Sequence, residues 1–343
     1  MFNWQSEDIV CIYQPELTGW PEPPAMRQAA YDLLKAMGLN PGARRVLIKP
    51  NIVQGVSVDS GISVHPAFVD GIARYMREAG APSIVVAEGG GTDENHDMAT
   101  HFQRAGYTEW AEVAGVPLVD LNADEYVRIP IAGRIFKSLP IASTVVQPDQ
   151  FVINVAKLKT HNFAITSLTM KNLQGVVVPM QERHMCNAGF PRYDGDRGGA
   201  FGRVLDTHER WANKICDILH AIRPDLNMVD GLVGRDGTGF ERGQNYPCRL
   251  AIAGMNPVAV DTVASYLMGF DPEHLTYLRV AGERGLGPDR LDRIHTYVVL
   301  GGKPELCRDI ASLRVSPHFR VLLSEDYQYL SYEDVPYANP ECL

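Results

Sequence analysis

Residues 154–179 concentrate side chains that donate hydrogen bonds, and they include neither Asp nor Glu. The candidates for binding or proton transfer in this stretch are Asn154, Lys157, Lys159, His161, Lys171 and Asn172. Ammonium groups and side-chain amides suit carboxylates and phosphates, because these anions present several acceptor oxygens. We therefore predict that the stretch holds a small anionic molecule. The alternative is a solvated basic loop before a surface helix.

The flanking residues predict how this stretch is positioned. Residues 151–156 form a short apolar, β-branched run that is typical of a buried strand. Apolar residues at Ile165, Leu168 and Leu173 are compatible with a helix over 165–173. KLKTHN (157–162) is then expected to be the loop between the strand's carboxyl end and a helix N-terminus, where α/β proteins commonly bind anions.

Polar residues also follow two earlier apolar runs. The predicted strand over 45–51 ends in Lys49 and Asn51, and the one over 83–88 ends in Glu88, which Gly89 follows. Because the carboxyl ends of parallel strands meet at one edge of a sheet, one cleft could gather these residues with Asn154 and Lys157. Residues 89–91 are all glycine and could let backbone approach a phosphate, but a flexible turn is equally compatible with them.

Alternation of strand and helix patterns predicts the fold class. Further strands are expected over 9–13, 226–230, 248–253 and 295–300, and helices over 24–37, 66–79, 206–222, 256–268 and 275–284. This order predicts an α/β fold with a mainly parallel sheet and helices on both faces. A small β insertion near 117–143 is expected from the segments 117–120, 126–131 and 135–139. We expect one domain over 1–303, with two lobes meeting near 150–180 as the alternative, and a C-terminal surface tail over 304–343.

Composition restricts the partners. The chain has 343 residues, 45% of them hydrophobic, and a formal net charge of −9, which argues against nucleic-acid or membrane-surface binding. Its six cysteines form no CxxC pair, so we expect reduced thiols and no iron–sulfur cluster. No signal peptide or membrane span is apparent, so cytoplasmic residence is the expectation. A homo-oligomer is compatible with these features.

The candidate residues fall into three roles. As acids, bases or nucleophiles we select Glu88, Lys159, His161, Lys171 and His184. As binding groups for an anionic substrate we select Lys49, Asn51, Gly89, Asn154, Lys157 and Asn172. A divalent metal would suit a mixed set of nitrogen and oxygen ligands, for which we select His65, His161, His184, Asp230 and Glu241. His65 is equally suited to cap the helix that begins at Pro66, and Asp230 to cap a turn. Crowded lysines are expected to lower one another's pKa.

Several of these motifs together resemble a known family. They are K-P-N at 49–51, H-P at 65–66, E-A-G at 78–80, E-G at 88–89, A-G-Y at 105–107, N-x-x-K-x-K-T-H at 154–161, K-N-x-x-G at 171–175, His184, R-P-D-L at 223–226, D-G at 230–231, G-x-G-x-x-x-G at 237–243, N-P-V-A-V-D at 256–261 and M-G-F-D-P at 268–272. The chain resembles the domain of unknown function 362 family (DUF362). Some members look as if they add a cysteine-rich ferredoxin-like segment, which this chain lacks. The resemblance implies no particular reaction.

Three functional hypotheses are compatible with these residues and motifs. The first is an enzyme that acts on a carboxylate- or phosphate-bearing small molecule by metal-assisted acid/base chemistry, as an isomerase, lyase or hydrolase does. The second is a racemase or epimerase that holds an anionic organic or organometallic cofactor on its lysines. The third is a non-catalytic protein that binds an anion or a cofactor through the same lysines.

Overall fold

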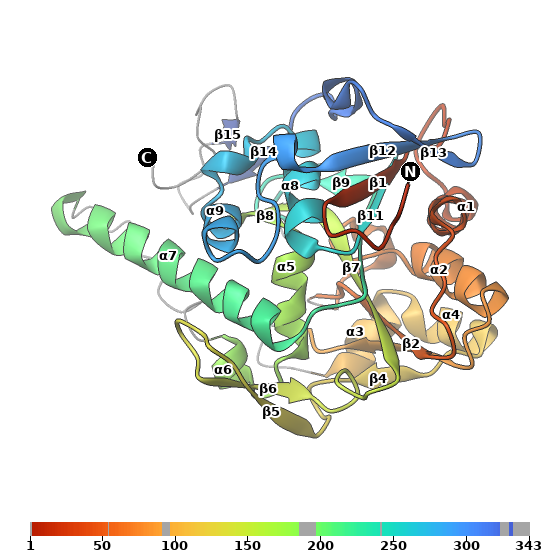
Figure 1. Cartoon of the computed structure of the whole chain (residues 1–343), viewed down its shortest axis with the longest axis horizontal. Helices are drawn as coiled ribbons and strands as arrows, with labels where there is room; N and C mark the ends of the chain where they lie inside the picture. The colour runs from red at the N-terminus through yellow and green to blue at the C-terminus, as the bar shows by residue number, and fades with distance from the viewer. Residues whose placement is uncertain are drawn as a thin grey trace.

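The computed structural model describes residues 2–53, 55–90, 97–184, 197–240, 242–322 and 329–331. One mixed sheet runs through the molecule, with helices packed on both of its faces (Figure 1). The strands are β1 (Ile9–Tyr13), β2 (Arg45–Pro50), β3 (Ile84–Glu88), β4 (Leu118–Asp120), β5 (Tyr126–Pro130), β6 (Ser138–Ala142), β7 (Gln150–His161), β8 (Ile165–Ser167), β9 (Leu226–Arg235), β10 (Asn245–Tyr246), β11 (Leu250–Gly254), β12 (His295–Leu300), β13 (Lys303–Leu306), β14 (Arg320–Leu322) and β15 (Tyr329–Ser331). The helices are α1 (Pro23–Met37), α2 (Pro66–Glu78), α3 (Met98–Arg104), α4 (Tyr107–Ala114), α5 (Thr169–Asn172), α6 (Met180–Arg183), α7 (Arg197–Ala221), α8 (Pro257–Met268) and α9 (Thr276–Glu283).

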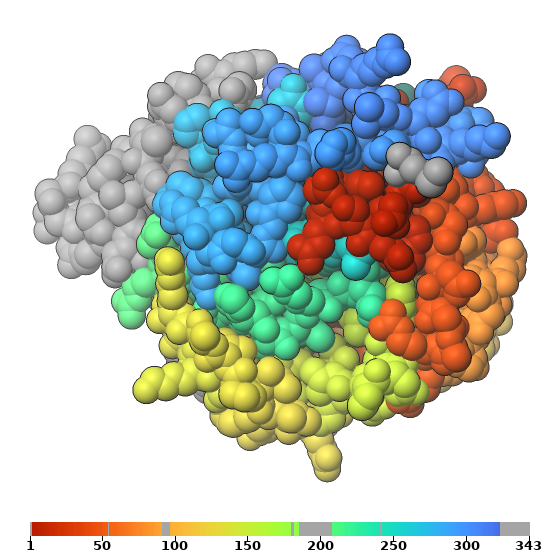
Figure 2. Space-filling view, viewed as in Figure 1, coloured from red at the N-terminus to blue at the C-terminus, as the bar shows by residue number. Residues whose placement is uncertain are grey.

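The strand order places β7 between β2 and β9, inside the parallel part of the sheet. Strands β4, β3, β2, β7 and β9 are neighbours in that order, and every pair among them is parallel. Strand β11 is antiparallel to both β9 and β1, and β12 continues parallel to β1. Figure 2 shows the chain's first residues in red beside blue residues of its last third, as the pairing of β1 with β12 requires. The predicted α/β fold with a mainly parallel sheet is confirmed.

Each face of the sheet has its own apolar core. On one face, Leu33 of α1 and Phe68 of α2 are buried with Ile48 of β2. On the other face, Trp211 of α7 and Val263 of α8 belong to a second buried cluster. Figure 1 shows α1, α2 and α4 on one side of the sheet and α5, α7, α8 and α9 on the other. Helices therefore cover both faces, as predicted from the strand–helix alternation.

Strand β7 is much longer than the sequence indicated. The expected loop KLKTHN is largely strand, because β7 continues through Lys157 and Lys159 to His161. Backbone pairing holds this extension: Lys157 is opposite Asp230 of β9, and Lys159 is opposite Ser167 of β8. A strand buried on both faces normally excludes lysine, which is why the sequence pattern indicates a loop here.

The expected helix over 165–173 is also wrong in its first half. The chain turns back after β7 and forms the short strand β8, and only residues 169–172 form the helix α5, followed by a 3-10 turn (Leu173–Val176). The N-terminus of α5 is already occupied, because the Asp261 carboxylate accepts from the Thr169 N–H at 2.8 Å and the Met170 N–H at 3.0 Å. It therefore does not offer the anion site that the sequence suggested.

The predicted β insertion is smaller than expected. Residues 118–120 are not part of it, because β4 extends the main sheet as the parallel neighbour of β3. Strands β5 and β6 alone form the separate two-stranded hairpin, and β6 begins later than the predicted segment at 135–139. Short apolar segments give no information about their partners, so the sequence could not separate the edge strand from the hairpin.

Residues after Pro304 contribute to the packed structure. Strand β13 pairs with β12 at the edge of the main sheet. Further along, Phe319 is fully buried and its N–H donates to the Met268 carbonyl at 2.9 Å, while the Leu322 N–H donates to Gly237 at 3.1 Å. The segment expected as a surface tail thus supports α8 and the glycine-rich loop after β9. Within the described residues, no helix is long and apolar enough to cross a membrane.

The glycine-rich loop after β9 lies directly on β7. Gly239 has a φ of +75°, and a Cβ on it would lie 1.9 Å from the Thr160 carbonyl oxygen. The Thr160 hydroxyl in turn donates to the Gly237 carbonyl at 2.8 Å. Glycine is required at position 239 both for its backbone conformation and for this close approach.

We expect Gly239→Ala to destabilise the fold by more than about 3 kcal/mol, because left-handed strain and steric overlap both act there. Gly302→Ala is the matched control: Gly302 has a φ of +77°, but a Cβ would meet nothing within 4 Å. The control should lose only about 1–2 kcal/mol. Urea unfolding of both variants measures the difference, and equal losses would contradict the described contact between the loop and β7.

Candidate functional site

The parallel strands deliver charged side chains to one edge of the sheet. Lys49 lies at the end of β2, Glu88 at the end of β3, Lys157 and Lys159 near the end of β7, and Asp230 within β9. Each of these side chains is almost completely buried. The structure therefore brings these charges together, but in a packed cluster and not in the open cleft that the sequence suggested.

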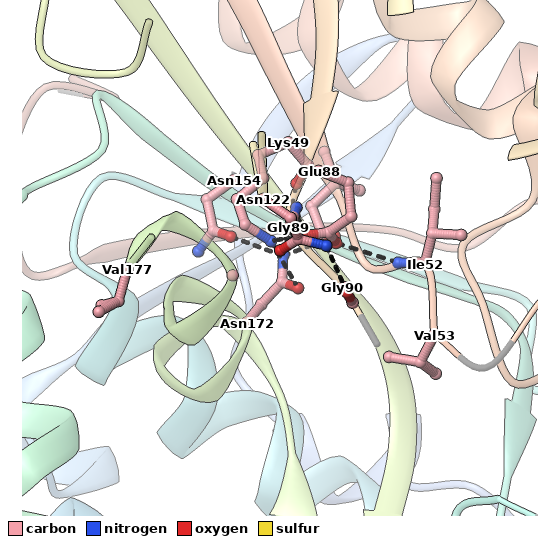
Figure 3. Close-up of polar contacts among 12 residues, drawn as sticks. Lys49, Ile52, Val53, Glu88, Gly89, Gly90, Asn122, Asn154, Asn172 and Val177 are labelled. Carbon is pink, nitrogen blue, oxygen red and sulfur yellow. Dashed lines mark hydrogen bonds and ion pairs between the residues drawn. The ribbon is translucent and has the colours of Figure 1, made fainter. Parts of the chain in front are cut away.

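Lys49 and Glu88 form the first ion pair of this cluster (Figure 3). The Lys49 Nζ lies 2.7 Å from Glu88 Oε1 and also donates to Asn172 Oδ1 at 3.2 Å. Glu88 accepts further hydrogen bonds from the N–H groups of Ile52, at 3.1 Å, and Gly89, at 2.8 Å. Burial lowers the pKa of Lys49, and the Glu88 charge opposes that effect.

Side-chain amides connect this pair to β7 and β9. Asn172 donates to Asn154 Oδ1 at 2.8 Å, and Asn154 donates to Asn227 Oδ1 at 2.8 Å and to the Thr169 carbonyl at 2.9 Å. Asn227 continues the chain by donating to the Met255 carbonyl at 2.7 Å. Asn154 and Asn172, predicted to bind substrate, are thus engaged in a buried network that fixes α5 against the sheet.

Lys157 and Asp230 form a second buried ion pair. The Lys157 Nζ lies 2.8 Å from Asp230 Oδ2, and the same oxygen accepts the His65 N–H at 3.2 Å. The His65 ring caps α2, because its Nδ1 accepts the Ala67 N–H at 3.0 Å. Burial lowers the pKa of His65. The capping role that the sequence allowed for His65 is present in the structure.

Lys159 is in a different environment from Lys49 and Lys157. Its Nζ donates to the Ile62 carbonyl at 2.9 Å and lies 4.9 Å from the centre of the Phe240 ring. Within the described residues it has no carboxylate partner. Burial lowers the pKa of Lys159 well below 10.5, and the charges of Lys171, Lys157 and Arg235 lower it further.

Lys171 and His161 complete this part of the cluster. Lys171 is partly exposed and makes no ion pair within the described residues; burial, followed by the Lys49 charge, lowers its pKa to about 8. His161 is also partly exposed, and its pKa lies well below 6.5 because of burial and then the charges of Lys171 and Lys159. The expectation that crowded lysines lower one another's pKa agrees with these directions, but burial is the larger cause.

Arg183 is a buried charge that the sequence analysis did not select. Its guanidinium donates to the carbonyls of Gly89 and Val177 and to Asn122 Oδ1. Burial lowers the pKa of Arg183 to about 10. Gly89 is required because a Cβ would lie 2.3 Å from the Gly175 carbonyl oxygen. No signal in the sequence distinguished Arg183 from a surface arginine.

Two other residues contribute: Asp261, which belongs to the N-P-V-A-V-D motif and suits a capping or a functional role equally, and Phe240, which the sequence does not select. Asp261 holds the first turn of α5 from α8, and burial raises its pKa to about 7 although the Thr169 and Met170 hydrogen bonds oppose the shift. Phe240 packs against both Lys159 and His161. Asn51, predicted to bind substrate, has a buried Oδ1 that accepts no hydrogen bond from the described residues. An acceptor of this kind suits a ligand hydroxyl or amine.

Within the described residues, the predicted metal ligands do not form one cluster. Among the described residues, no three His, Cys, Asp or Glu side chains are placed to hold a metal ion. His65 and Asp230 are neighbours through a backbone hydrogen bond, and His161 lies with the lysines. His184 follows α6 and is partly exposed, and Glu241 lies outside the described residues. A divalent metal therefore stays a prediction.

Surface cavities lie away from this cluster. One of about 320 Å³ is bordered by α8 and the segment 270–273, with Tyr266 and Arg290 in its wall. Another of about 270 Å³ is bordered by Arg249 and the segment 313–316. Neither is lined by any of the predicted site residues. Burial and charge, and not an open cavity, mark the lysine cluster as the candidate site.

The fold and the buried charges define an α/β protein with a lysine-rich cluster at the carboxyl ends of its parallel strands. The family model described as "Domain of unknown function (DUF362)" matches residues 46–266, and the chain belongs to this family. The matched region includes the cluster from Lys49 to Asp261. Thylakoid-associated protein sll1697 from Synechocystis sp. is 25% identical to this chain over 249 residues, which are 71% of this chain and 69% of that protein.

The Lys49–Glu88 pair provides a direct test of the cluster's energetics. Lys49→Met should cost about 3–5 kcal/mol of unfolding free energy, because it leaves Glu88 buried without its counter-charge. Adding Glu88→Gln should restore part of that loss. Arg290→Met is the control, because Arg290 and Glu273 are 2.8 Å apart but exposed, and its loss should be below about 1 kcal/mol. Similar losses at both pairs in urea unfolding would contradict the burial described for Lys49.

Proposed function

We propose that this protein is an enzyme that binds a carboxylate- or phosphate-bearing small molecule and acts on it by acid/base chemistry. Lys159 and Lys171 hold the anion, and Lys171 transfers the proton. The observation that carries this proposal is that two amines with lowered pKa values lie together without a carboxylate partner among the described residues. Lys49 and Lys157 differ, because each already has a carboxylate partner, Glu88 and Asp230 respectively.

Electrostatics favour an anion at this position. Burying an ammonium without a counter-charge is costly, so an anion that pairs with Lys159 or Lys171 recovers part of that cost. Asp230 and Glu88 are each engaged by another lysine and by backbone N–H groups, so they do not neutralise these two amines. Lys171 and His161 are partly exposed, which gives a ligand access at these two residues.

The pKa of Lys171 suits proton transfer. A general base works best when its pKa lies near the working pH, and the value of about 8 places Lys171 close to neutral conditions. A lysine with a lowered pKa can also attack a carbonyl carbon and form a Schiff base. Both roles belong to reactions in which a proton moves next to a carbonyl group, as in isomerases, racemases and lyases.

The proposal also includes a metal that assists the reaction or an anionic cofactor, and both can be measured directly. The lysines supply positive charge to an anionic transition state without requiring a metal. An organic or organometallic cofactor with phosphate or carboxylate groups would use the same amines. Elemental analysis and native mass spectrometry of protein purified without chelator detect either one.

The cytoplasmic location and the homo-oligomeric state also stay predictions.

Proton uptake on anion binding tests the proposed site without knowledge of the substrate. An anion stabilises the protonated form of Lys171, so binding near pH 8 should take up to about half a proton at this amine. Affinity should fall as pH rises above about 8, because free Lys171 then loses its proton. Calorimetry with inorganic phosphate, oxalate and 2-hydroxy acids, in buffers of different ionisation enthalpy, measures both effects.

Lys171→Met should remove the proton uptake and weaken binding, whereas Lys303→Met, at an exposed position in β13, should change neither. Normal melting temperatures in both variants are the control for folding. Binding without proton uptake, or uptake unchanged in Lys171→Met, would contradict the assignment. Exchange of the substrate's α-proton for deuterium, lost in Lys171→Met, would separate an enzyme from a protein that only binds the anion.

A further inference from the structure

The ring of His161 has one nitrogen that is fixed as an acceptor. Strand β7 ends at His161, and in the following turn the N–H groups of Phe163, at 3.0 Å, and Ala164, at 3.3 Å, both point at Nδ1. A backbone N–H can only donate, so Nδ1 must keep its lone pair. The proton of the neutral ring is therefore on Nε2, which is a donor.

A second proton on this ring is unfavourable for geometric reasons. Protonation of Nδ1 would break both backbone hydrogen bonds and leave the Phe163 and Ala164 N–H groups without their acceptor. It would also add a positive charge beside Lys159 and Lys171, and near His208. The lowered pKa of His161 agrees with this geometry. His161 is consequently a poor general base, in contrast to the catalytic role first suggested by its sequence motif.

The turn that creates this arrangement is strained. Ile165, paired opposite His161 in the β7–β8 hairpin, has a φ of +65°, a conformation that β-branched residues rarely adopt. Backbone strain of this kind persists where the surrounding structure enforces it, and it is common at functional sites. The strained turn delivers two N–H groups to one ring nitrogen and so fixes the orientation of the imidazole.

The other ring nitrogen is available. Nε2 donates to no described residue, and the side chain is partly exposed. Phe240 packs edge-on against the imidazole with ring centres 5.1 Å apart, and the same phenyl ring lies 4.9 Å from the Lys159 ammonium. The phenyl ring thus fixes a neutral donor beside two amines.

We propose that His161 is a fixed, neutral hydrogen-bond donor, which gives its Nε2–H to a carbonyl or carboxylate oxygen of the anionic ligand. This inference rests on the proposed function and adds the class of ligand atom that His161 recognises. In a reaction that moves a proton next to a carbonyl, such a donor stabilises the negative charge that develops on the oxygen. Lys171 would then be the group that transfers the proton, and His161 the electrophilic partner.

The same geometry argues against two of the predicted metal ligands. A neutral imidazole binds a metal through a nitrogen lone pair, but in His161 the Nδ1 lone pair is engaged by backbone and Nε2 carries the proton. His65 repeats the arrangement, because its Nδ1 accepts the Ala67 N–H. Both histidines are therefore assigned as Nε2–H donors.

The tautomer can be measured directly on the full-length protein. Long-range proton–nitrogen NMR of ¹⁵N-histidine-labelled protein, with His161 assigned by its loss in His161→Gln, should show the Nε2–H tautomer from about pH 8 down to about pH 5.5. A ring with its proton on Nδ1, or one that titrates near its usual pKa, would overturn the inference whatever ligand the protein binds.

Two variants test the donor role through ligand binding. His161→Leu removes the donor and should weaken oxalate binding about tenfold or more, whereas His161→Gln retains an N–H and should lose much less. His295→Leu, at an exposed histidine that begins β12, is the control and should bind oxalate as the unmodified protein does. Oxalate binding unchanged in His161→Leu, with proton uptake by Lys171 intact, would overturn the role of His161 while leaving the proposed function in place. If the unmodified protein bound oxalate without proton uptake but His161 showed the Nε2–H tautomer, the role proposed for Lys171 would be overturned and the assignment of the His161 ring would stand.

Discussion

The cost of removing lysine ammonium groups from water governs the central part of this structure. Lys49, Lys157 and Lys159 are all almost completely buried at the ends of adjacent strands. A charge in such a position needs an opposite charge or several hydrogen bonds, or else it loses its proton. The protein meets this requirement for Lys49 and Lys157 with Glu88 and Asp230. For Lys159 and the neighbouring Lys171 the described residues provide no such partner, and the proposed anion site is therefore placed at this pair.

Elements distant in sequence enforce this arrangement. Asp261 from α8 holds the first turn of α5, so the position of Lys171 depends on a carboxylate that follows it by 90 residues. The loop after β9 lies against Thr160, and Phe240 from that loop covers Lys159. Phe319, near the end of the described chain, is buried against the end of β9, where a Cβ on Gly234 would lie 2.5 Å from its ring. The lysines are thus fixed by packing that spans most of the sheet, which is the preorganisation an electrostatic site requires.

The sequence predicted the elements well where their patterns were regular. Strand 9–13 was placed with its observed ends, and α1, α2 and α8 within a residue or two, because their apolar periodicity and their Pro or Gly boundaries are local signals. It failed at 157–173, where tertiary contacts decide the conformation. Lys157 extends a buried strand only because Asp230 is opposite it in β9, and α5 is short because residues 165–167 pair with β7. For the candidate site, residue type identified Lys159, His161 and Lys171. Arg183 and Phe240 could not be found, because nothing in their neighbourhood in the sequence indicates burial. Asp261 lies in a predicted apolar helix, but its contact with the first turn of α5 is tertiary and has no local signal.

The contrast between the lysines and the histidines determines which chemistry this cluster can support. Histidine is the usual first choice for a general base, and the KTH motif made His161 a natural candidate, while His65 was a candidate metal ligand. In the structure both rings give their Nδ1 lone pair to backbone N–H groups, so neither offers a free basic nitrogen in its neutral form. The amine of Lys171, with a pKa of about 8, is then the group best suited to exchange a proton near neutral pH. The proposed site, with a proton-transferring lysine, an imidazole donor and a second buried amine, would suit a substrate whose anionic group and carbonyl oxygen are close together, as in 2-oxo and 2-hydroxy acids.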